Sequence, residues 1–388
     1  MLRVAEKMMR LGTETAFDVL ARADTLARQG RDIINLGIGQ PDFKPAPHIV
    51  EAGIRALRDG HHGYTPSPGI SHLREAIAAD ILLYRGVNVD PSRIVVVPGG
   101  KVTMFFAILM FGEPGAEILY PNPGFPIYQS LIEFTGATAV PIHLVEEKNF
   151  SFDADVVLDQ ITPNTRLLIL NSPANPTGGA SARDEIEHLV SGLIDFPYVA
   201  ILSDEIYSRI HYDGVEHISL LSYPDIEDRV ILLDGWSKTY AMTGWRIGYG
   251  VWPEVLVDGA IRLAVNSHSC VNTAVQYAGI AALEGPQEPL GAMLTAFDER
   301  RRVIVSGLNK LPGIHCRNPI GAFYAFPNIT GTGLDSRTIQ GRLLEEVGVA
   351  TVAGTSFGAL GEGYLRLSYA NSMENIQAGM DRIAELLA

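Results

Sequence analysis

One short segment of the sequence places a lysine, two hydroxyl residues and an arginine directly after an apolar run. Residues 232–250 read LLDGWSKTYAMTGWRIGYG, in which Lys238 lies between Ser237 and Thr239. Arg246 follows eight residues after the lysine. A neutral lysine amine attacks carbonyl carbons, while hydroxyls and an arginine bind anions. A lone lysine after a strand is most often a solvated turn residue, so the chemistry needs support from other parts of the chain.

Other polar residues and a pair of glycines end further apolar runs. They are Asn171 and Asn175 in RLLILNSPANPTGG, Asp204 and Tyr207 in VAILSDEIY, and Gly99 and Gly100 in VVVPGGKVT. In open α/β sheets, ligands bind beyond the carboxyl ends of the strands, and glycines that open a helix expose backbone N–H groups to an anion. Each feature alone also has a structural explanation. Asp204 could cap a helix, Asn175 could belong to a turn, and the glycines could simply join a strand to a helix.

Together these residues fit the chemistry of pyridoxal 5'-phosphate. Lys238 is suited to a Schiff base with the aldehyde of this cofactor, which then acts as an electron sink. Asp204 is suited to pairing with a protonated ring nitrogen, and the two glycines, Ser237 and Arg246 are suited to the phosphate. The sequence therefore predicts a cofactor site at one edge of a sheet.

Six apolar runs predict the strands of that sheet, in an α/β fold. Their near-continuous Val, Ile and Leu content indicates mostly parallel strands that are buried on both faces. They cover residues 93–98, 116–121, 137–144, 166–173, 198–205 and 229–237. Helical patterns cover residues 101–112, 182–196 and most of 270–310, where 297–311 could form one long helix. A compact α+β unit is expected towards the C-terminus.

Composition restricts the class of protein and its partners. With 388 residues, 47% of them hydrophobic, the chain is long enough for two domains. Its net charge of −14 argues against nucleic acid and anionic membranes as partners. Two cysteines far apart, no signal-peptide pattern and no apolar run of membrane-spanning length predict a cytoplasmic protein.

Eight motifs, in order and spacing, resemble those of class I aminotransferases, which are fold type I pyridoxal-phosphate enzymes of the aspartate aminotransferase superfamily. They are NLGIGQPDF (35–43), YTPSPGISHLREAIA (64–78), PGGK (98–101), YPNPGFPIY (120–128), NSPANPTGG (171–179), SDEIY (203–207), SKTYAMTGWRIGY (237–249) and GTSFGALGEGYLRLSYA (354–370). The resemblance implies a large cofactor-binding domain, residues 46–295, with a mostly parallel sheet of about seven strands. Residues 1–45 and 296–388 would form a small α+β domain.

The resemblance also implies roles around the cofactor ring. Lys238 would bind the cofactor covalently and transfer a proton at the substrate's Cα, and with Asp204 and Tyr207 it would form the catalytic set. Asp204 would pair with the ring nitrogen, while Tyr207 and Asn175 would contact the phenolic oxygen. Phe125 would stack on the ring face.

The same resemblance implies how the phosphate is held. Ser237, Arg246 and the backbone of Gly99 and Gly100 would bind it, with Lys101 directly beside them among the cofactor-binding residues. Tyr64 would reach the phosphate of the neighbouring subunit. The protein is therefore expected to be a homodimer with shared active sites.

For the substrate, the resemblance implies a carboxylate clamp. Arg366 in GYLRLSYA would bind the α-carboxylate in a two-pronged ion pair, Gly39 would leave room for it, and Asn175 would be a further substrate-binding residue. Lys101 resembles a lysine with which some bacterial aspartate or prephenate aminotransferases bind a second carboxylate, but it could equally point to solvent. GTETAFDV, residues 12–19, departs from the hydroxyl-bearing pattern that usually accompanies that lysine.

The predicted function is transfer of an amino group from an L-amino acid to a 2-oxo acid. The mechanism would be ping-pong, with the cofactor alternating between its pyridoxal and pyridoxamine forms and with aspartate or another dicarboxylic acid as a candidate donor. A pyridoxal-phosphate-dependent lyase or oxidase acting on an amino acid would use the same residues. A ligand-sensing regulator is a weaker alternative, because only about 30 residues precede the fold and the net charge is −14.

Two other charged stretches are expected to be structural. His61 and His62 have no further ligand at metal-binding spacing, so no metal site is expected. DERRR, residues 298–302, is predicted to be a solvated helix face.

Overall fold

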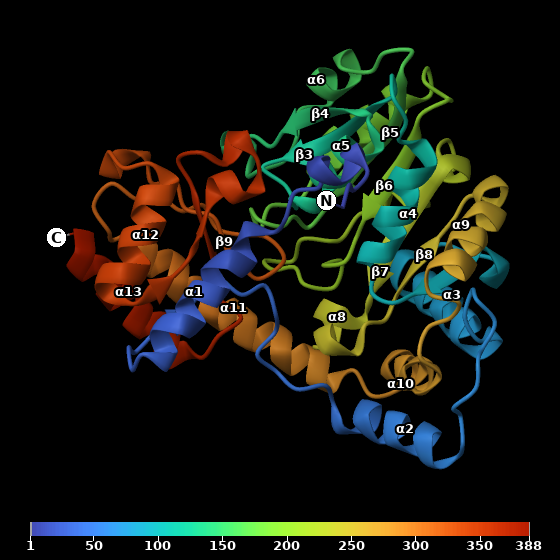
Figure 1. Ribbon diagram of the computed structural model, residues 1–388, viewed down its shortest axis with the longest axis horizontal. Helices are drawn as coiled ribbons and strands as arrows, with labels where there is room; N and C mark the ends of the chain where they lie inside the picture. Colours follow the sequence, from blue (N-terminus) through green and yellow to red (C-terminus); the bar gives the residue numbers. More distant parts are fainter. Residues whose placement is uncertain (1, 388) are drawn as a thin grey trace.

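A seven-stranded mixed sheet forms the centre of the molecule in this computed structural model, which describes residues 2–387 (Figure 1). The strand order is β2-β8-β7-β6-β5-β3-β4. Strands β3 to β7 pair in parallel, and β8 is antiparallel to both of its neighbours. The strands are β2 (Ile94–Val97), β3 (Glu117–Asn122), β4 (Thr138–His143), β5 (Thr165–Asn171), β6 (Ala200–Asp204), β7 (Val230–Gly235) and β8 (Gly248–Val251). The predicted α/β class with a mostly parallel sheet is confirmed.

Two departures from the predicted strands have physical reasons. All six predicted strands are present, but β4 is not buried on both faces, because it lies at the edge of the sheet with Thr138 and His143 exposed. Strand β8 was not among the six predicted strands, and its glycines weaken any strand signal. Those glycines are required by close packing, since a Cβ on Gly248 would lie 2.3 Å from the backbone nitrogen of Gly100.

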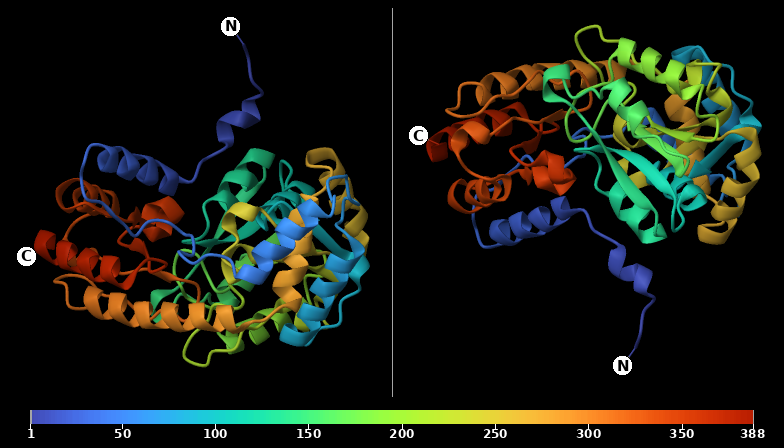
Figure 2. Two further views of the ribbon diagram at one scale, coloured as in Figure 1. Left: turned by 90° about the horizontal axis from the view of Figure 1, so that it is seen from below. Right: turned by 90° about the horizontal axis from the view of Figure 1, so that it is seen from above.

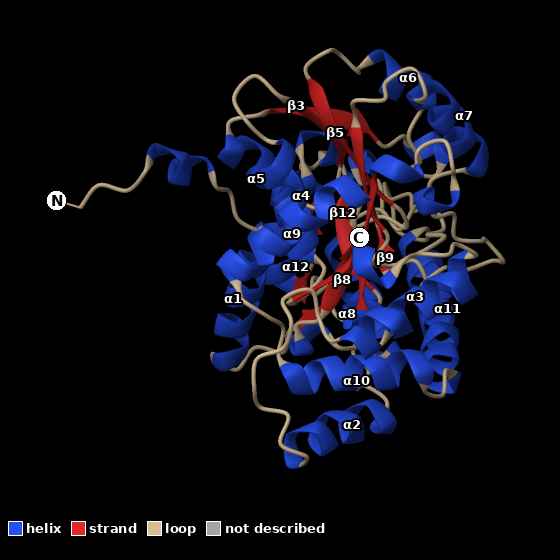
Figure 3. Cartoon of the chain, turned by 90° about the vertical axis from the view of Figure 1, so that its right-hand side faces the viewer, coloured by secondary structure: helices blue, strands red, loops and turns tan. Residues whose placement is uncertain are grey.

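Helices cover both faces of this sheet (Figure 3). Alternate residues of β2 pack into different hydrophobic cores. Val95 and Val97 pack with α4, α5 and α9 on one face, whereas Ile94 and Val96 pack with the helices of the other face. That alternation follows from the two-residue period of a strand. The helices of the first face are α4 (Lys101–Phe111), α5 (Ile127–Thr135) and α9 (Glu254–Ser267). Those of the second are α2 (Pro47–Arg58), α3 (Ser71–Arg85), α6 (Ala154–Asp159), α7 (Arg183–Leu193) and α10 (Thr273–Glu284).

The C-terminal residues and the start of the chain pack together in a separate hydrophobic core (Figures 1 and 2). An antiparallel sheet of order β11-β12-β9 and a parallel pair of β1 with β10 lie there, and α1 packs on β10. The strands are β1 (Ile34–Asn35), β9 (Tyr324–Ala325), β10 (Val349–Ala350), β11 (Val352–Ala353) and β12 (Leu365–Ser368). The helices are α1 (Thr15–Arg28), α11 (Glu288–Leu308), α12 (Ser336–Val347) and α13 (Met373–Leu387). The division at residues 45 and 295 stays a prediction.

The long helix α11 corrects two expectations. It begins at Glu288, earlier than the predicted residue 297, and Pro289 lies in its first turn, where a proline does not interrupt a helix. The prediction of a solvated face for residues 298–302 is wrong for two arginines. Arg301 is buried, with ion pairs to Asp213 and Asp298, and Arg300 packs its guanidinium over Phe43.

The segment before α1 projects beyond the outline of the fold in Figures 2 and 3 but is held against α5, because Arg10 donates to the Phe134 carbonyl at 3.2 Å and the Gly12 N–H donates to the Ser130 hydroxyl at 2.9 Å. It carries the short 3-10 helix η1 (Glu6–Arg10), which has no buried residue. Across the described part of the chain, no helix has both the length and the apolar character that crossing a membrane requires.

Candidate active site

A cavity of about 420 Å³ opens at the carboxyl ends of β5, β6 and β7. Residues of α1, β9 and β12 close it from the other side. It brings together most of the residues that the sequence predicted for the site. These are Gly39, Gly100, Lys101, Phe125, Asn175, Asp204, Tyr207, Ser237, Lys238, Arg246 and Arg366.

Lys238 lies in α8 (Trp236–Thr239), the single helical turn that follows β7. The turn is fixed because Trp236 is buried and donates its indole N–H to the Gly279 carbonyl at 3.0 Å. The Lys238 Nζ donates to the Gly39 carbonyl at 2.5 Å. Burial, reinforced by the positive charges of Arg366 and Arg246, lowers the pKa of Lys238 to about 7. A large share of this amine is therefore neutral, and hence nucleophilic, near neutral pH.

Asp204 ends β6, the strand next to β7, and lines the same cavity. Tyr128 donates its hydroxyl to the Asp204 Oδ2 at 2.6 Å, and the Asn171 amide donates to the Asp204 backbone carbonyl at 3.0 Å. Burial raises the pKa of Asp204 to about 6, although the Tyr128 hydrogen bond acts in the other direction. No helix directly follows β6 in the described chain, so helix capping does not explain this residue. A cationic neighbour would stabilise the ionised form.

Tyr207 and Gly39 are connected through a residue that the sequence did not single out. The Tyr207 and Tyr324 hydroxyls are 2.8 Å apart, and both side chains are buried. A Cβ on Gly39 would lie 2.5 Å from the Tyr324 hydroxyl. Gly39 thus leaves room for this tyrosine, while its predicted role beside a substrate carboxylate is untested.

Arg366, on β12, is a buried cation with donor capacity left over. Its Nη1 donates to the Asn175 Oδ1 at 3.0 Å and its Nη2 to the Gly37 carbonyl at 2.6 Å. The rings of Tyr324 and Phe357 lie 4.6 and 4.7 Å from the guanidinium carbon. Within the described residues, its Nε has no hydrogen-bond partner although it is buried. An unsatisfied N–H on a buried guanidinium is suited to a carboxylate ligand.

The turn between β2 and α4 forms a cradle for an anion. Gly99 has a φ of +88°, and a Cβ there would lie 2.2 Å from the Arg246 Nη2. The Gly99 N–H donates to the Val97 carbonyl at 2.7 Å, so the backbone donors that this turn can offer an anion are those that open α4 after Gly99, and Ser237 and Arg246 line the same cavity. Helix N-terminus, hydroxyl and guanidinium together fit a phosphate group, and with Lys238 and Asp204 they fit pyridoxal 5'-phosphate.

Two other predicted residues have surroundings that the sequence did not indicate. Lys101 forms an ion pair with Glu14, and its Nζ lies 5.0 Å from the centre of the Phe125 ring. Tyr64 lies outside this cavity, and its side chain is 92% exposed. The structure of a single chain therefore does not bring Tyr64 to its own site, and its predicted reach into a neighbouring subunit is untested.

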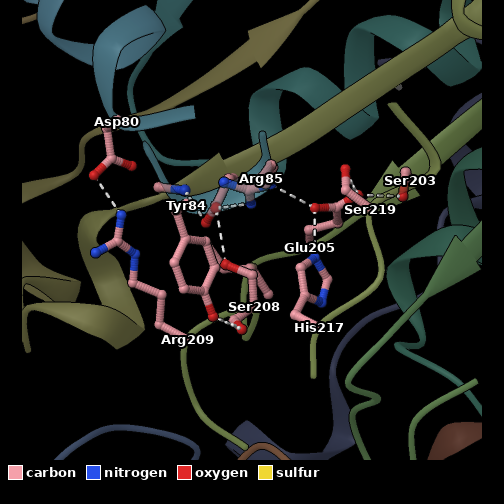
Figure 4. Close-up of polar contacts among 12 residues, drawn as sticks. Asp80, Tyr84, Arg85, Ser203, Glu205, Ser208, Arg209, His217 and Ser219 are labelled. Carbon is pink, nitrogen blue, oxygen red and sulfur yellow. Dashed lines mark hydrogen bonds and ion pairs between the residues drawn. The ribbon is translucent and has the colours of Figure 1, made fainter. Parts of the chain in front are cut away.

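A buried network of charges surrounds Glu205, the residue that follows Asp204 (Figure 4). Arg85, at the end of α3, donates from Nε to Glu205 at 2.8 Å and from Nη2 to Asp234 at 2.5 Å. His217 lies 2.7 Å from Glu205, and Ser208 donates to Asp234 at 3.1 Å. The network fixes the segment after β6 that carries Tyr207. Its members are far apart in the sequence, so no local pattern could reveal it.

Several further residues of the cavity have only weak signals in the sequence. Tyr128 lies in the YPNPGFPIY motif, but only the fold shows that its hydroxyl reaches Asp204. Glu14 and Phe17 come from the first residues of the chain, and Tyr324 and Phe357 from its last quarter. Their participation depends on tertiary contacts that residue spacing does not encode.

The arrangement defines a class of protein, and comparison with known proteins identifies it. Residues 31–383 match the family described as "Aminotransferase class I and II". The chain is 34% identical to aspartate aminotransferase from Geobacillus stearothermophilus, over 98% of each chain. It is 36% identical to aromatic-amino-acid aminotransferase 2 from Thermococcus litoralis, over 93% of each. The solved structure of Thermus thermophilus aspartate aminotransferase with maleate superimposes with a TM-score of 0.95, at 33% identity over 100% of both chains.

The chain belongs to the class I and II aminotransferase family, whose members use pyridoxal phosphate. It is an aminotransferase, and the resemblance and the fold predicted from the sequence are confirmed. The names of the relatives specify different amino-acid substrates, aspartate in one case and aromatic amino acids in another. Membership of the family therefore does not decide the substrate of this chain.

Proposed function

We propose that this aminotransferase binds pyridoxal 5'-phosphate in the cavity around Lys238 and transfers an amino group from an L-amino acid to a 2-oxo acid. The observation that carries the proposal is that one cavity holds two buried groups with opposite pKa shifts. They are the Lys238 amine, whose pKa is lowered, and the Asp204 carboxylate, whose pKa is raised. The cofactor, when bound, supplies an electron sink for charge at the substrate's Cα and carries the amino group between the two half-reactions of a ping-pong cycle.

Lys238 is proposed to have two roles. Its amine would be the covalent anchor of the cofactor and, when released, the base that takes the proton from the substrate's Cα. A pKa of about 7 suits both roles, because the amine can bind and release a proton near neutral pH. The hydrogen bond to the Gly39 carbonyl orients the amine towards the cavity.

The remaining cofactor contacts are proposed from the positions of the side chains. Asp204, supported by Tyr128, would hold a proton on the ring nitrogen, and Phe125 would cover the ring. Tyr207 and Asn175 would contact the phenolic oxygen. The phosphate would be bound by the backbone N–H groups that open α4 after Gly99 and by the side chains of Ser237 and Arg246, while the Gly99 N–H itself donates to the Val97 carbonyl. Lys101, predicted beside the phosphate, is assigned instead to the substrate, because it pairs with Glu14 at the outer part of the cavity.

Arg366 is proposed to clamp the α-carboxylate of every substrate. Its unpartnered Nε and the Tyr324 and Phe357 rings around it support this role. By holding the carboxylate, Arg366 would orient the substrate so that its Cα–H bond is the one exposed to the base, which would favour deprotonation over decarboxylation.

A homodimer with shared sites is part of the proposal. It is supported by the exposure of Tyr64 and of the apolar residues Leu57 and Leu83 on the same chain. Both an aspartate and an aromatic aminotransferase are among the relatives, so dicarboxylic and apolar side chains are both candidates for the donor.

The test is the visible absorption spectrum of the purified protein with single L-amino acids. We expect a band of covalently bound cofactor that bleaches with a donor and returns when a 2-oxo acid is added. Lys238→Ala should lower turnover by at least about 10³-fold while the cofactor still binds without a covalent bond, because the base is lost and the phosphate contacts remain.

Lys310→Ala is the matched control, since Lys310 is exposed at the end of α11 and does not line the cavity. Normal transamination by Lys238→Ala would refute the proposed mechanism. Release of a 2-oxo acid without reversal by an acceptor would indicate the lyase or oxidase alternative.

A further inference from the structure

The ion pair between Glu14 and Lys101 lies in the wall of the cavity. Glu14 immediately precedes α1, and Lys101 is the first residue of α4, so the pair joins two elements that are far apart in the sequence. The Glu14 side chain is 16% exposed and that of Lys101 is 45% exposed. The Glu14 carboxylate is therefore largely shielded from solvent, whereas the Lys101 amine remains accessible to it.

Besides pairing with Lys101, Glu14 acts electrostatically on Lys238 and Arg366. Its negative charge raises the pKa of Lys238 and that of Arg366, against the larger effect of burial on each. Four cations and two carboxylates line the cavity among the described residues: Lys101, Lys238, Arg246, Arg366, Glu14 and Asp204. Asp204 is engaged by Tyr128, so Glu14 is the carboxylate at the substrate end.

The surroundings of this ion pair are apolar. Ala16, Phe17 and Leu20 line the cavity from α1, and Phe125 lies under the Lys101 amine. A substrate whose α-carboxylate reaches Arg366 would extend its side chain between these groups. An apolar side chain there is covered by aromatic and aliphatic atoms and leaves the ion pair intact.

A second carboxylate on the substrate meets a different situation. Lys101 is the cation available to it at this end, and Glu14 already occupies that cation. Displacing Glu14 would leave a partly buried carboxylate without its counter-ion, at a cost that an apolar substrate does not incur. We propose that Glu14 is a specificity-determining residue, which competes with the distal carboxylate of dicarboxylic substrates for Lys101 and so favours apolar side chains. This inference rests on the proposed function of the cavity.

The first test compares substrates. Glu14→Gln keeps the shape of the side chain but removes its charge, so Lys101 becomes free for a substrate carboxylate. The ratio of kcat/KM for aspartate to kcat/KM for phenylalanine should rise about tenfold. Adding Lys101→Met to Glu14→Gln should abolish that gain, because the cation responsible for it is gone.

Asp18→Asn is the control for the loss of one negative charge from the same part of the chain, since Asp18 is exposed in α1 and does not line the cavity. It should leave the ratio of the two substrates at the wild-type value. A rise in Asp18→Asn as large as that in Glu14→Gln would overturn the proposal, because the effect would then be one of overall charge.

The second test measures binding without turnover. Calorimetric titration of the cofactor-loaded protein with succinate should give a dissociation constant about tenfold lower in Glu14→Gln than in the wild type. Butyrate, which has a single carboxylate, should bind equally to both. Equal succinate affinity in the two proteins would overturn the role of Glu14. Tighter succinate binding in a protein that does not transaminate would refute the proposed reaction while supporting this assignment.

Discussion

Lys238 is a buried amine among cations, and its surroundings decide when it reacts. Burial is the largest cause of its lowered pKa, and Arg366 and Arg246 add to it. The unfolded chain binds more protons at this residue than the folded chain between about pH 7 and the ordinary value of 10.5. The contribution of Lys238 to the stability of the cofactor-free protein therefore rises with pH across that window. The neutral amine becomes available from about pH 7 upwards.

The pH dependence of covalent cofactor attachment should show this directly. The rate at which cofactor-free protein binds pyridoxal 5'-phosphate covalently should rise about tenfold per pH unit below pH 7 and level off above it, because only the neutral amine attacks the aldehyde. Stopped-flow absorbance from about pH 5.5 to 9 measures it. Arg366→Gln should move the break to higher pH by removing a neighbouring cation, whereas the exposed Arg342→Gln should not. A rate that keeps rising to the top of this range would contradict the assigned pKa.

At the scale of single elements, the turn between β2 and α4 combines two constraints. Gly99 adopts a left-handed φ of +88°, and it also leaves the space that Arg246 fills. The first constraint concerns folding, because side chains with a Cβ are strained there. The second concerns the proposed phosphate site, because a Cβ would displace the guanidinium.

Two alanine substitutions separate these constraints. Gly115 has a φ of +90°, and a Cβ at this position would have no atom within 4 Å, so Gly115→Ala adds strain alone. Both Gly99→Ala and Gly115→Ala should lower the free energy of unfolding by about 1 kcal/mol. Only Gly99→Ala should also weaken cofactor binding, by about tenfold or more, in an equilibrium titration. Equal cofactor affinity in the two variants would show that Arg246 does not need its present position.

Some of the helices and strands could be predicted from sequence patterns and others could not. The six buried-strand patterns and the helix after PGGK depend on local composition, so their positions could be predicted to within a few residues. Strand β8 could not, because its glycines are required by the close approach of the 99–100 turn. In the cavity, residues at strand ends were predictable because parallel strands end at one edge. Glu14, Tyr128 and Tyr324 were not, since each acts through a contact with a distant segment.

At the scale of the whole molecule, the charge is distributed unevenly. The chain carries a net charge of −14, yet the cavity is lined by Lys101, Lys238, Arg246 and Arg366. A local cationic site within an acidic protein suits small anions such as carboxylates and a phosphate, while the overall charge opposes association with nucleic acid.

The buried charge network should contribute to the stability of the whole fold. Arg85→Met keeps the bulk of the side chain but leaves Glu205 and Asp234 without their shared cation, and it should cost about 3–5 kcal/mol of unfolding free energy. Urea unfolding measures it. Arg342→Met is the control, because the pair of Arg342 with Glu346 is exposed and should contribute little. Equal stability of the two variants would mean that the network is dispensable.

The same network restricts how this sequence can diverge. A single substitution of Arg85 leaves Glu205 and Asp234 in the core without their shared cation, and a substitution of either carboxylate leaves a buried N–H of the Arg85 guanidinium without its acceptor, so most such intermediates would be lost to selection before a second change could compensate. Descendant sequences should therefore either keep all three residues or replace them together by a set without net charge. The three positions, of which the outermost two are 149 residues apart, are expected to change as one inherited unit.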